Sequence, residues 1–344
     1  MCSKHIDELL ALCISGISFL TFKEKNILQN NIDSLSALAV LSIHDISRIV
    51  GRSFRSAQWD GKRAVREAER SARILNAFNI TMLPYAQSAY PALLREIANP
   101  PFALFYRGNA NCLGSRTVSV VGTRRMTAQG KQAAFSFARD AACDGVTVVS
   151  GLANGIDGEA HKGALESCFD AMEAGAESGK TCAILPCGCD MIVPASHKKL
   201  AEKILATGGA LVSEYLPGTP SQSWRFVHRN RIIAALSPAT VVIEAPPGSG
   251  ALHTAQFALD CNRDVLFHES AFSKSAATVA ERVKQKLEND FALGKVSKSK
   301  LESTVERYRS DGAPVIKDYD DYCHCRAELP GMRNSKTIAQ EQLF

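Results

Sequence analysis

The chain has 344 residues, of which 46% are hydrophobic and 22% charged, and its formal net charge is +5. This composition is typical of a globular protein and excludes a disordered or fibrous chain. No apolar run reaches the roughly 18 residues that a membrane span needs, and the apolar stretch at 9–22 follows acidic residues rather than a basic segment. The sequence therefore predicts neither a membrane anchor nor a secretory signal.

Eleven cysteines are present, and most fall within strand or helix patterns, where a reduced thiol acts as a small hydrophobe. The pairs Cys187 with Cys189 and Cys323 with Cys325 are separated by one residue, whereas zinc ligands are usually separated by about two to four. We therefore expect a reducing, cytoplasmic compartment, no metal site and no cofactor.

Residues 1–80 are predicted to form a small helical domain, because apolar residues recur there at helical spacing. The segment from Arg48 to Arg73 contains eight basic residues and three acidic ones. Two interpretations remain open for these charges. They form either a solvated helix surface with local ion pairs or a surface that faces nucleic acid.

A proline-rich connector follows and leads into a second domain at 81–325. From Thr117 onward, short β-branched runs alternate with helix-length segments, which predicts an α/β fold with a doubly wound, mostly parallel sheet. About six strands are expected at Thr117–Val121, Val146–Val149, Thr181–Leu185, Ala210–Ser213, Thr240–Ile243 and Asp264–Phe267. Residues 170–180 are expected to form a surface insertion, and 326–344 a tail without a core.

Glycine-bearing loops follow three of these strands. Parallel strands place such loops at one sheet edge, where α/β proteins bind ligands. Glycine lets backbone N–H groups approach an anion, and arginine presents a planar fork suited to phosphate oxygens. The sequence therefore predicts a phosphate-binding edge. Its residues are Gly122, Thr123, Arg124, Arg125, Ser150, Gly151, Ala153, Asn154, Gly155, Arg229, Asn230, Arg231, Ser249 and Gly250.

Four further polar residues near these loops are interpreted as orienting groups rather than catalysts. Asp157 is predicted to cap the helix that it opens, with His161 as a partner one turn later. Glu214 and Glu244 end strands and are expected to orient nearby arginines. No dinucleotide fingerprint and no Walker lysine is present, which argues against NAD and ATP.

These motifs resemble the DNA-processing protein A family, also called DprA or Smf. The resemblance covers roughly residues 80–325 and rests on an ordered series of motifs. They include Tyr90-Pro91, Leu104 to Asn109, Val120 to Arg124, Ser150 to Asp157 with His161, Ser213-Glu214, Arg229-Asn230-Arg231, Val242 to Ala245, and Ser249-Gly250.

The resemblance implies an extended Rossmann-like domain that binds single-stranded DNA and forms a homodimer. It also implies that the protein protects incoming DNA and loads the RecA recombinase in natural transformation, without catalytic activity. In the family, residues matching Arg124, Ser150 to Gly155, Arg229 and Arg231 face the DNA backbone. Members carry a sterile-alpha-motif-like domain where residues 1–80 lie.

The sequence departs from the family pattern in places. Val193 to His197 and Phe226-Val227 differ from the usual motifs, His268 to Ser270 replace a common Pro-Gly, and no room remains for a winged helix. The last residues, with Gln340, Leu343 and Phe344, are similar to peptides that dock on the bacterial sliding clamp. The alternative to a DNA-binding protein is a nucleotide phosphoribohydrolase, suggested by Pro247 to Ala251, although Thr254 stands where that chemistry needs a glutamate.

Overall fold

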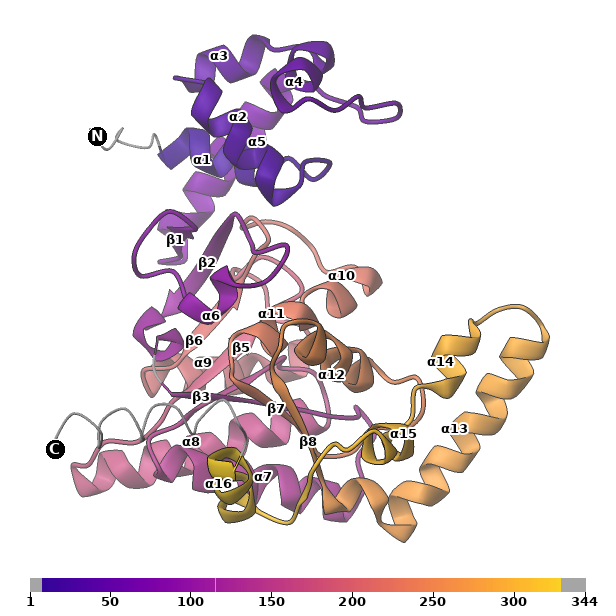
Figure 1. The fold of residues 1–344 in the computed structure, drawn as a ribbon. Coiled ribbons are helices and arrows are strands. Elements are labelled where there is room, and N and C mark those ends of the chain that lie inside the picture. The colour runs from indigo at the N-terminus through magenta and orange to yellow at the C-terminus, as the bar shows by residue number, and fades with distance from the viewer. Residues whose placement is uncertain (1–7, 115, 329–344) are drawn as a thin grey trace, which may run out of the picture. The chain divides into compact units, whose positions relative to one another are not determined.

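The computed structural model describes residues 8–114 and 116–328 (Figure 1). The chain divides into two compact units, one built from residues up to 114 together with 183–229, the other from 115–182 together with the residues from 230 onward. The predicted boundary near residue 80 falls inside the first unit and stays a prediction. Each unit is described by itself below.

The first unit begins with the predicted helices. They are α1 (Glu8–Ser15), α2 (Phe22–Asn31), α3 (Leu35–Val40), α4 (Ile43–Val50) and α5 (Gly61–Ala77). Their ends are set by side-chain caps: Thr21 with Glu24 and Ser42 with Asp45 each form a capping box, which satisfies backbone N–H groups that the first turn leaves without helical acceptors. Leu28, Leu38 and Ile46 form the buried interior of these short helices.

The capping carboxylate Glu24 also holds Arg52, whose Nε lies 2.5 Å from its Oε1. The hydrogen bond from Arg52 lowers the pKa of Glu24 to about 2. A carboxyl whose pKa is depressed on folding stabilises the protein above its unfolded pKa and loses that effect as pH falls through the folded value. Replacing Glu24 with glutamine is therefore expected to lower the free energy of unfolding by about 1–2 kcal/mol at neutral pH, the half-exposed Arg52 limiting the effect.

That loss should shrink as pH falls below the usual glutamate range and vanish near the folded pKa of about 2. Urea titrations of both proteins across pH measure it. A difference that stays constant across acidic pH would show that the ion pair is not its source.

The remaining elements of the first unit form its β portion. They are β1 (Thr81–Pro84), α6 (Ala92–Arg95), β2 (Ala103–Gly108), α9 (Lys198–Ala206), β6 (Ala210–Ser213) and α10 (Ser223–His228), with short 3-10 turns at Ala110–Leu113 and Ala195–His197. β2 pairs antiparallel with both β1 and β6. Pro84 is tolerated because β1 is an edge strand and needs fewer ladder donors.

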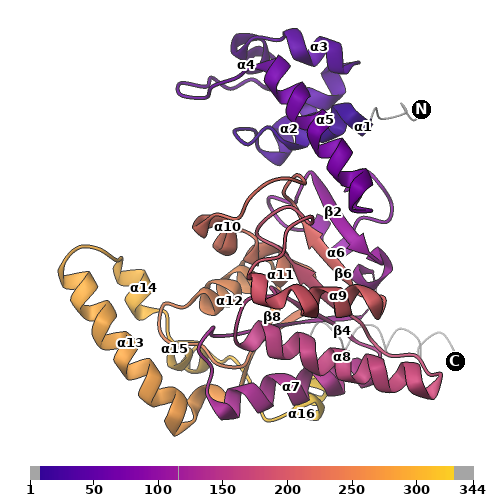
Figure 2. The same cartoon turned by 180° about the vertical axis from the view of Figure 1, so that it is seen from behind.

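The second unit contains the parallel strands. Its elements are β3 (Thr117–Val121), α7 (Ala128–Cys143), β4 (Thr147–Ser150), α8 (Ile156–Ala174), α11 (Asn230–Ala235), β7 (Ala239–Val242), α12 (Gly250–Asp260), β8 (Asp264–His268), a 3-10 turn at Glu269–Phe272, α13 (Lys274–Ala292), α14 (Lys298–Glu302), α15 (Val305–Ser310), β9 (Val315–Ile316) and α16 (Tyr319–Glu328). β3 lies between β4 and β7, parallel to both. α7, α8 and α16 share one buried core with these strands, and α13 lies beside α14 (Figure 2).

The predicted α/β class and doubly wound sheet are confirmed. Nine strands form the sheet in the order β1-β2-β6-β5-β4-β3-β7-β8-β9, where β5 is Thr181–Ile184. From β3 the strands β4, β5 and β6 follow toward one side and β7, β8 and β9 toward the other, so the direction of strand addition switches between β3 and β7. Such a switch point opens a crevice at the carboxyl ends of the strands.

One expectation needs correction, and one helix was missed. The helix α8 continues to Ala174 and ends at the left-handed Gly175, so only the last part of the predicted insertion at 170–180 lies outside a helix. The six strands expected from Thr117 onward are all present, as β3 to β8, and β1, β2 and β9 complete the sheet of nine. The helix α16 was not predicted, because its sequence is largely polar; its Tyr319 and Tyr322 make edge-to-face contacts with Phe137.

Candidate functional site

The turn after β3 presents two arginines. Thr123 is buried, and its N–H donates to the carbonyl of Glu244 after β7 at 2.7 Å. Its hydroxyl accepts from the Arg125 N–H at 3.1 Å, which closes a tight local turn. The side chain of Thr123 thus fixes the backbone, while Arg124 and Arg125 are exposed. Two guanidinium groups project from a rigid turn at the switch point.

The loop after β4 is packed against that turn. The Ile156 N–H donates to the Thr123 carbonyl at 3.1 Å, and Gly155 has φ of 83°, a conformation that favours glycine. A Cβ on Gly155 would lie 2.3 Å from the Thr123 carbonyl oxygen, so only glycine permits this approach. Leu152, fully buried, also has a left-handed φ of 56°. Strained backbone of this kind is frequent in ligand-binding loops.

Other predicted residues of this loop serve inside the protein. Ser150 is buried and its hydroxyl donates to the Val120 carbonyl at 2.6 Å, which ties β4 to β3. Gly151 and Ala153 are buried as well, whereas Asn154 is exposed and Gly155 half-buried. The surface of the loop therefore consists of Asn154 and the backbone around it.

The third glycine loop, after β7, is held from two sides. Asn230 Nδ2 and the Thr254 hydroxyl both donate to the Gly250 carbonyl at 3.2 Å. Ser249 stands at the N-cap of α12, yet its Oγ is buried without a hydrogen-bond partner among the described residues. A hydroxyl in this position, at a helix N-terminus, can donate to an anion. Gly250 is exposed, and Arg231 is half-buried.

The N-terminus of α7 is filled by the protein's own carboxylate. Glu244 is buried and accepts from the Thr127 N–H at 2.9 Å and from the Thr127 hydroxyl at 2.5 Å. A Cβ on Gly130 would lie 2.3 Å from this carboxyl group. In mononucleotide-binding folds the helix after the first strand receives a phosphate. Here Glu244 occupies that position, and its carboxylate accepts hydrogen bonds from Thr127 rather than from an arginine.

Asp157 and His161 lie one turn apart on α8. The helix begins at Ile156 with Gly155 as its cap, so the expectation that Asp157 is the N-cap is wrong. Asp157 instead accepts from the Ala153 N–H at 3.4 Å, beneath the loop. His161 is fully buried, and its Nδ1 lies 2.6 Å from the Thr181 hydroxyl, which donates to the Val148 carbonyl. This contact ties α8 to the sheet.

In the first unit, Arg229 is an internal residue. Its side chain is only 2% exposed, and Nη1 donates to the Ile184 carbonyl at 2.7 Å. A side chain so placed cannot reach the phosphate of a bound polymer in this conformation. The predicted phosphate contact from Arg229 is therefore not supported, and the residue is better described as a support for the segment that precedes α11.

Aromatic side chains gather beside the basic residues Arg225 and His228 of α10. The two basic residues were expected near the binding edge, whereas the aromatic ones were not predicted as part of a site. Arg225 stacks over the rings of Tyr215 and Trp224, with Cζ 4.8 Å and 5.2 Å from the two centroids. Trp224 is 54% exposed. His228 Nδ1 lies 3.0 Å from both the Tyr215 hydroxyl and Glu214 Oε1, so Glu214 orients a histidine. A tryptophan within a polar segment is the sequence feature that could have indicated this cluster.

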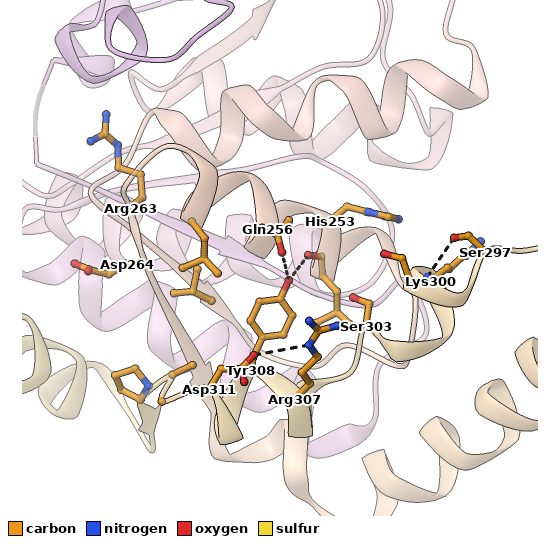
Figure 3. A pocket seen from close by; sticks show the side chains of 17 residues that line it. His253, Gln256, Arg263, Asp264, Ser297, Lys300, Ser303, Arg307, Tyr308 and Asp311 are labelled. Carbon is orange, nitrogen blue, oxygen red and sulfur yellow. Dashed lines mark hydrogen bonds and ion pairs between the residues drawn. The ribbon is translucent and has the colours of Figure 1, made fainter.

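A cavity of about 560 Å³ lies beside the third glycine loop (Figure 3). The Gly248 N–H donates to the Ser303 carbonyl at 2.9 Å, so residues 297–303 border that loop. Tyr308 lines the cavity, and its hydroxyl donates a hydrogen bond to the Leu252 carbonyl at 3.2 Å. Burial and, secondarily, Lys300 lower the pKa of His253, which leaves this imidazole neutral near pH 7. Residues 288–312 are polar, lysine-rich and weakly helical by sequence, and they were not predicted as part of a site.

No group of three or more His, Cys, Asp or Glu side chains within residues 8–114 and 116–328 is arranged to hold a metal ion. The cysteines within the described residues form no disulfide bond, and burial raises the pKa of Cys187 to about 12. Among the helices that the structure describes, none is long and apolar enough to cross a membrane. The predicted clamp-docking residues Gln340, Leu343 and Phe344 lie outside the described residues.

The fold and the site together define a Rossmann-like α/β protein whose carboxyl edge presents exposed arginines, while its usual nucleotide phosphate position is filled by Glu244. The chain belongs to the DNA recombination-mediator protein A family, whose model matches residues 81–292. Its role is accordingly that of a recombination mediator rather than an enzyme.

Several relatives support this assignment. Protein Smf of Borreliella burgdorferi is 29% identical over 316 residues, covering 92% of this chain and 94% of the relative. Protein Smf of Escherichia coli is 39% identical over 187 residues, which are 54% of this chain and 47% of that protein. The X-ray structure of DNA processing protein A from Streptococcus pneumoniae matches with a TM-score of 0.63 and 25% identity, over 94% of this chain and 98% of the other.

A second solved structure shares the fold. It is DNA processing protein A from Helicobacter pylori, in a study of that protein's single-stranded DNA binding mode, with a TM-score of 0.54 and 23% identity over 73% of this chain and 97% of the other.

The phosphoribohydrolase alternative has no support, because Thr254 is buried and its hydroxyl donates a hydrogen bond to the Gly250 carbonyl.

Proposed function

We propose that this protein binds single-stranded DNA through its phosphate backbone and delivers the strand to a RecA-type recombinase. The observation that carries the proposal is the rigid pair of loops in the second unit, where Arg124 and Arg125 project from a turn locked against Gly155. The occupied helix terminus at Glu244 argues against a mononucleotide as the ligand. A polymer needs exposed backbone contacts rather than an enclosed phosphate pocket.

The two units supply different kinds of contact. The second unit offers Arg124, Arg125 and the Ser249 hydroxyl for phosphate oxygens. The first offers Trp224, on which a base can stack, with Arg225 behind the ring. Stacking accepts any base, and backbone contacts carry no sequence information, so binding should be indifferent to sequence.

We further propose that the protein protects incoming DNA during natural transformation and assembles into a homodimer. We also propose that it contacts a sliding clamp through the residues at the end of the chain. Family membership and, for the clamp, the Gln340 to Phe344 motif support them.

Labelled oligonucleotides titrated across salt concentrations test the proposal. Single strands should bind more tightly than the matched duplex, and the logarithm of affinity should fall with that of salt with a slope of about −2 to −4, for roughly three to six neutralised phosphates. Poly-pyrimidine and mixed sequences should give similar affinities. Binding that is independent of salt, or tighter for the duplex, would contradict the proposal.

A further inference from the structure

The helix α5 has two distinct faces. Gly61, Ala68 and Ser71 are buried on one side, where α5 packs against α1 and α3. On the opposite side lie four exposed basic residues at spacings of four, four and three, which places them along one stripe. We call these residues the α5 stripe: Lys62, Arg66, Arg70 and Arg73. They extend over about 16 Å of helix axis at 1.5 Å per residue.

Ion pairs account for other cations of this region but not for the α5 stripe. Arg48 pairs with Asp45, Arg52 with Glu24 and Arg63 with Glu67, the last on the flank of α5. No member of the α5 stripe forms an ion pair with another residue in the part of the chain that the structure describes. Within α5 the carboxylates next to the stripe are Glu69 and Glu67, and Glu67 is paired with Arg63, so positive charge on this face is largely uncompensated.

The α5 stripe belongs to the same compact unit as Trp224. The Ser71 hydroxyl donates to the Pro217 carbonyl at 3.0 Å, and Ile74 lies 3.0 Å from the position of a Cβ on Gly218. These contacts fix α5 on the turn that follows β6. From this turn the chain continues directly to α10 and the Arg225–Trp224 cluster.

We propose that the α5 stripe is a second contact surface for the phosphate backbone of single-stranded DNA. The proposal rests on the function proposed above and extends it to a helix outside the family match at 81–292. A row of unpaired cations on successive helical turns suits a linear polyanion, since each guanidinium can replace one condensed counterion. A strand that is long enough then extends from the stacking contact at Trp224 onto the helical domain of the same unit.

The test compares two triple variants on oligothymidines of about 8 and about 40 nucleotides. The first carries Arg66→Ala, Arg70→Ala and Arg73→Ala. The matched control carries Arg48→Ala, Arg55→Ala and Arg63→Ala, which removes the same charge from the same domain. For the long strand, the first variant should lower the magnitude of the salt slope by about 2, at about 0.7 per phosphate, and the control should not. Neither should change binding of the short strand.

The outcomes separate the two proposals. If the wild-type protein binds neither strand, the function proposed above fails. If the wild-type protein binds both and the stripe variant keeps its slope on the long strand, the α5 stripe proposal fails alone. It also fails if the control variant lowers the long-strand slope as much as the stripe variant does. Should the triple variant unfold, Arg70→Glu alone serves as the second variant, and it should weaken long-strand binding at least about threefold at low salt.

Discussion

Replacing Gly155 with alanine should lower the free energy of unfolding by about 2–4 kcal/mol and weaken single-stranded DNA binding at least about tenfold. Two effects act together. Alanine at a φ of 83° and ψ of −134° is strained by its own backbone. In addition, its Cβ would lie 2.3 Å from the Thr123 oxygen and 2.7 Å from Arg124 backbone atoms, which cannot swing aside as a side chain would.

The affinity falls because the displaced backbone carries Arg124 and Arg125. Urea unfolding gives the change in stability, and fluorescence anisotropy with a labelled strand, at a temperature where the variant is folded, gives the affinity. Gly145→Ala is the matched control, since Gly145 also has a left-handed φ, of 73°, but no atom lies within 4 Å of its added Cβ. It should cost about 1 kcal/mol and leave affinity unchanged. Equal effects of the two substitutions would show that the loop contact is not responsible.

Most of the fold could be predicted because the buried parallel strands are β-branched runs separated by helix-length segments, a pattern with few competing interpretations. β3 and β6, for example, have the predicted residues. The antiparallel pairing of β2 could not be read from the sequence, because strand direction follows from tertiary packing. α16 was missed for a different reason: two tyrosines, with the partly buried Cys323 and Cys325, are all that it packs against the core among its described residues.

The loops that form the candidate site could be predicted from the sequence, but the exposure and contacts of their side chains could not. Glycine marks the places where the backbone must approach another segment, and Gly155 shows such an approach. Residue type does not show whether an arginine is exposed. Arg124 and Arg229 look equivalent in the sequence, but one is exposed and the other buried against Ile184. Similarly, a glutamate at a strand end gave no sign that Glu244 would fill a helix terminus.

Because Arg229 is buried and Arg124 is exposed, replacing the first should change stability and replacing the second should change DNA binding. Arg229→Ala should lower the free energy of unfolding by about 3 kcal/mol, since it leaves the buried Ile184 carbonyl without this donor and opens a cavity. The protein that remains folded should keep a salt slope close to that of the wild type, because a buried guanidinium releases no counterion from DNA.

Arg124→Ala should do the opposite. Its side chain is exposed, so stability should change by no more than about 0.5 kcal/mol, whereas the salt slope should fall by about 0.7 and affinity should fall for every sequence alike. Urea unfolding and salt-dependent anisotropy on both variants measure the two quantities, and Arg229→Lys tests whether a shorter cation restores the internal contact. If Arg229→Ala flattened the salt slope while leaving stability intact, Arg229 would have to leave its internal position when DNA binds, and the phosphate contact predicted from the sequence would hold.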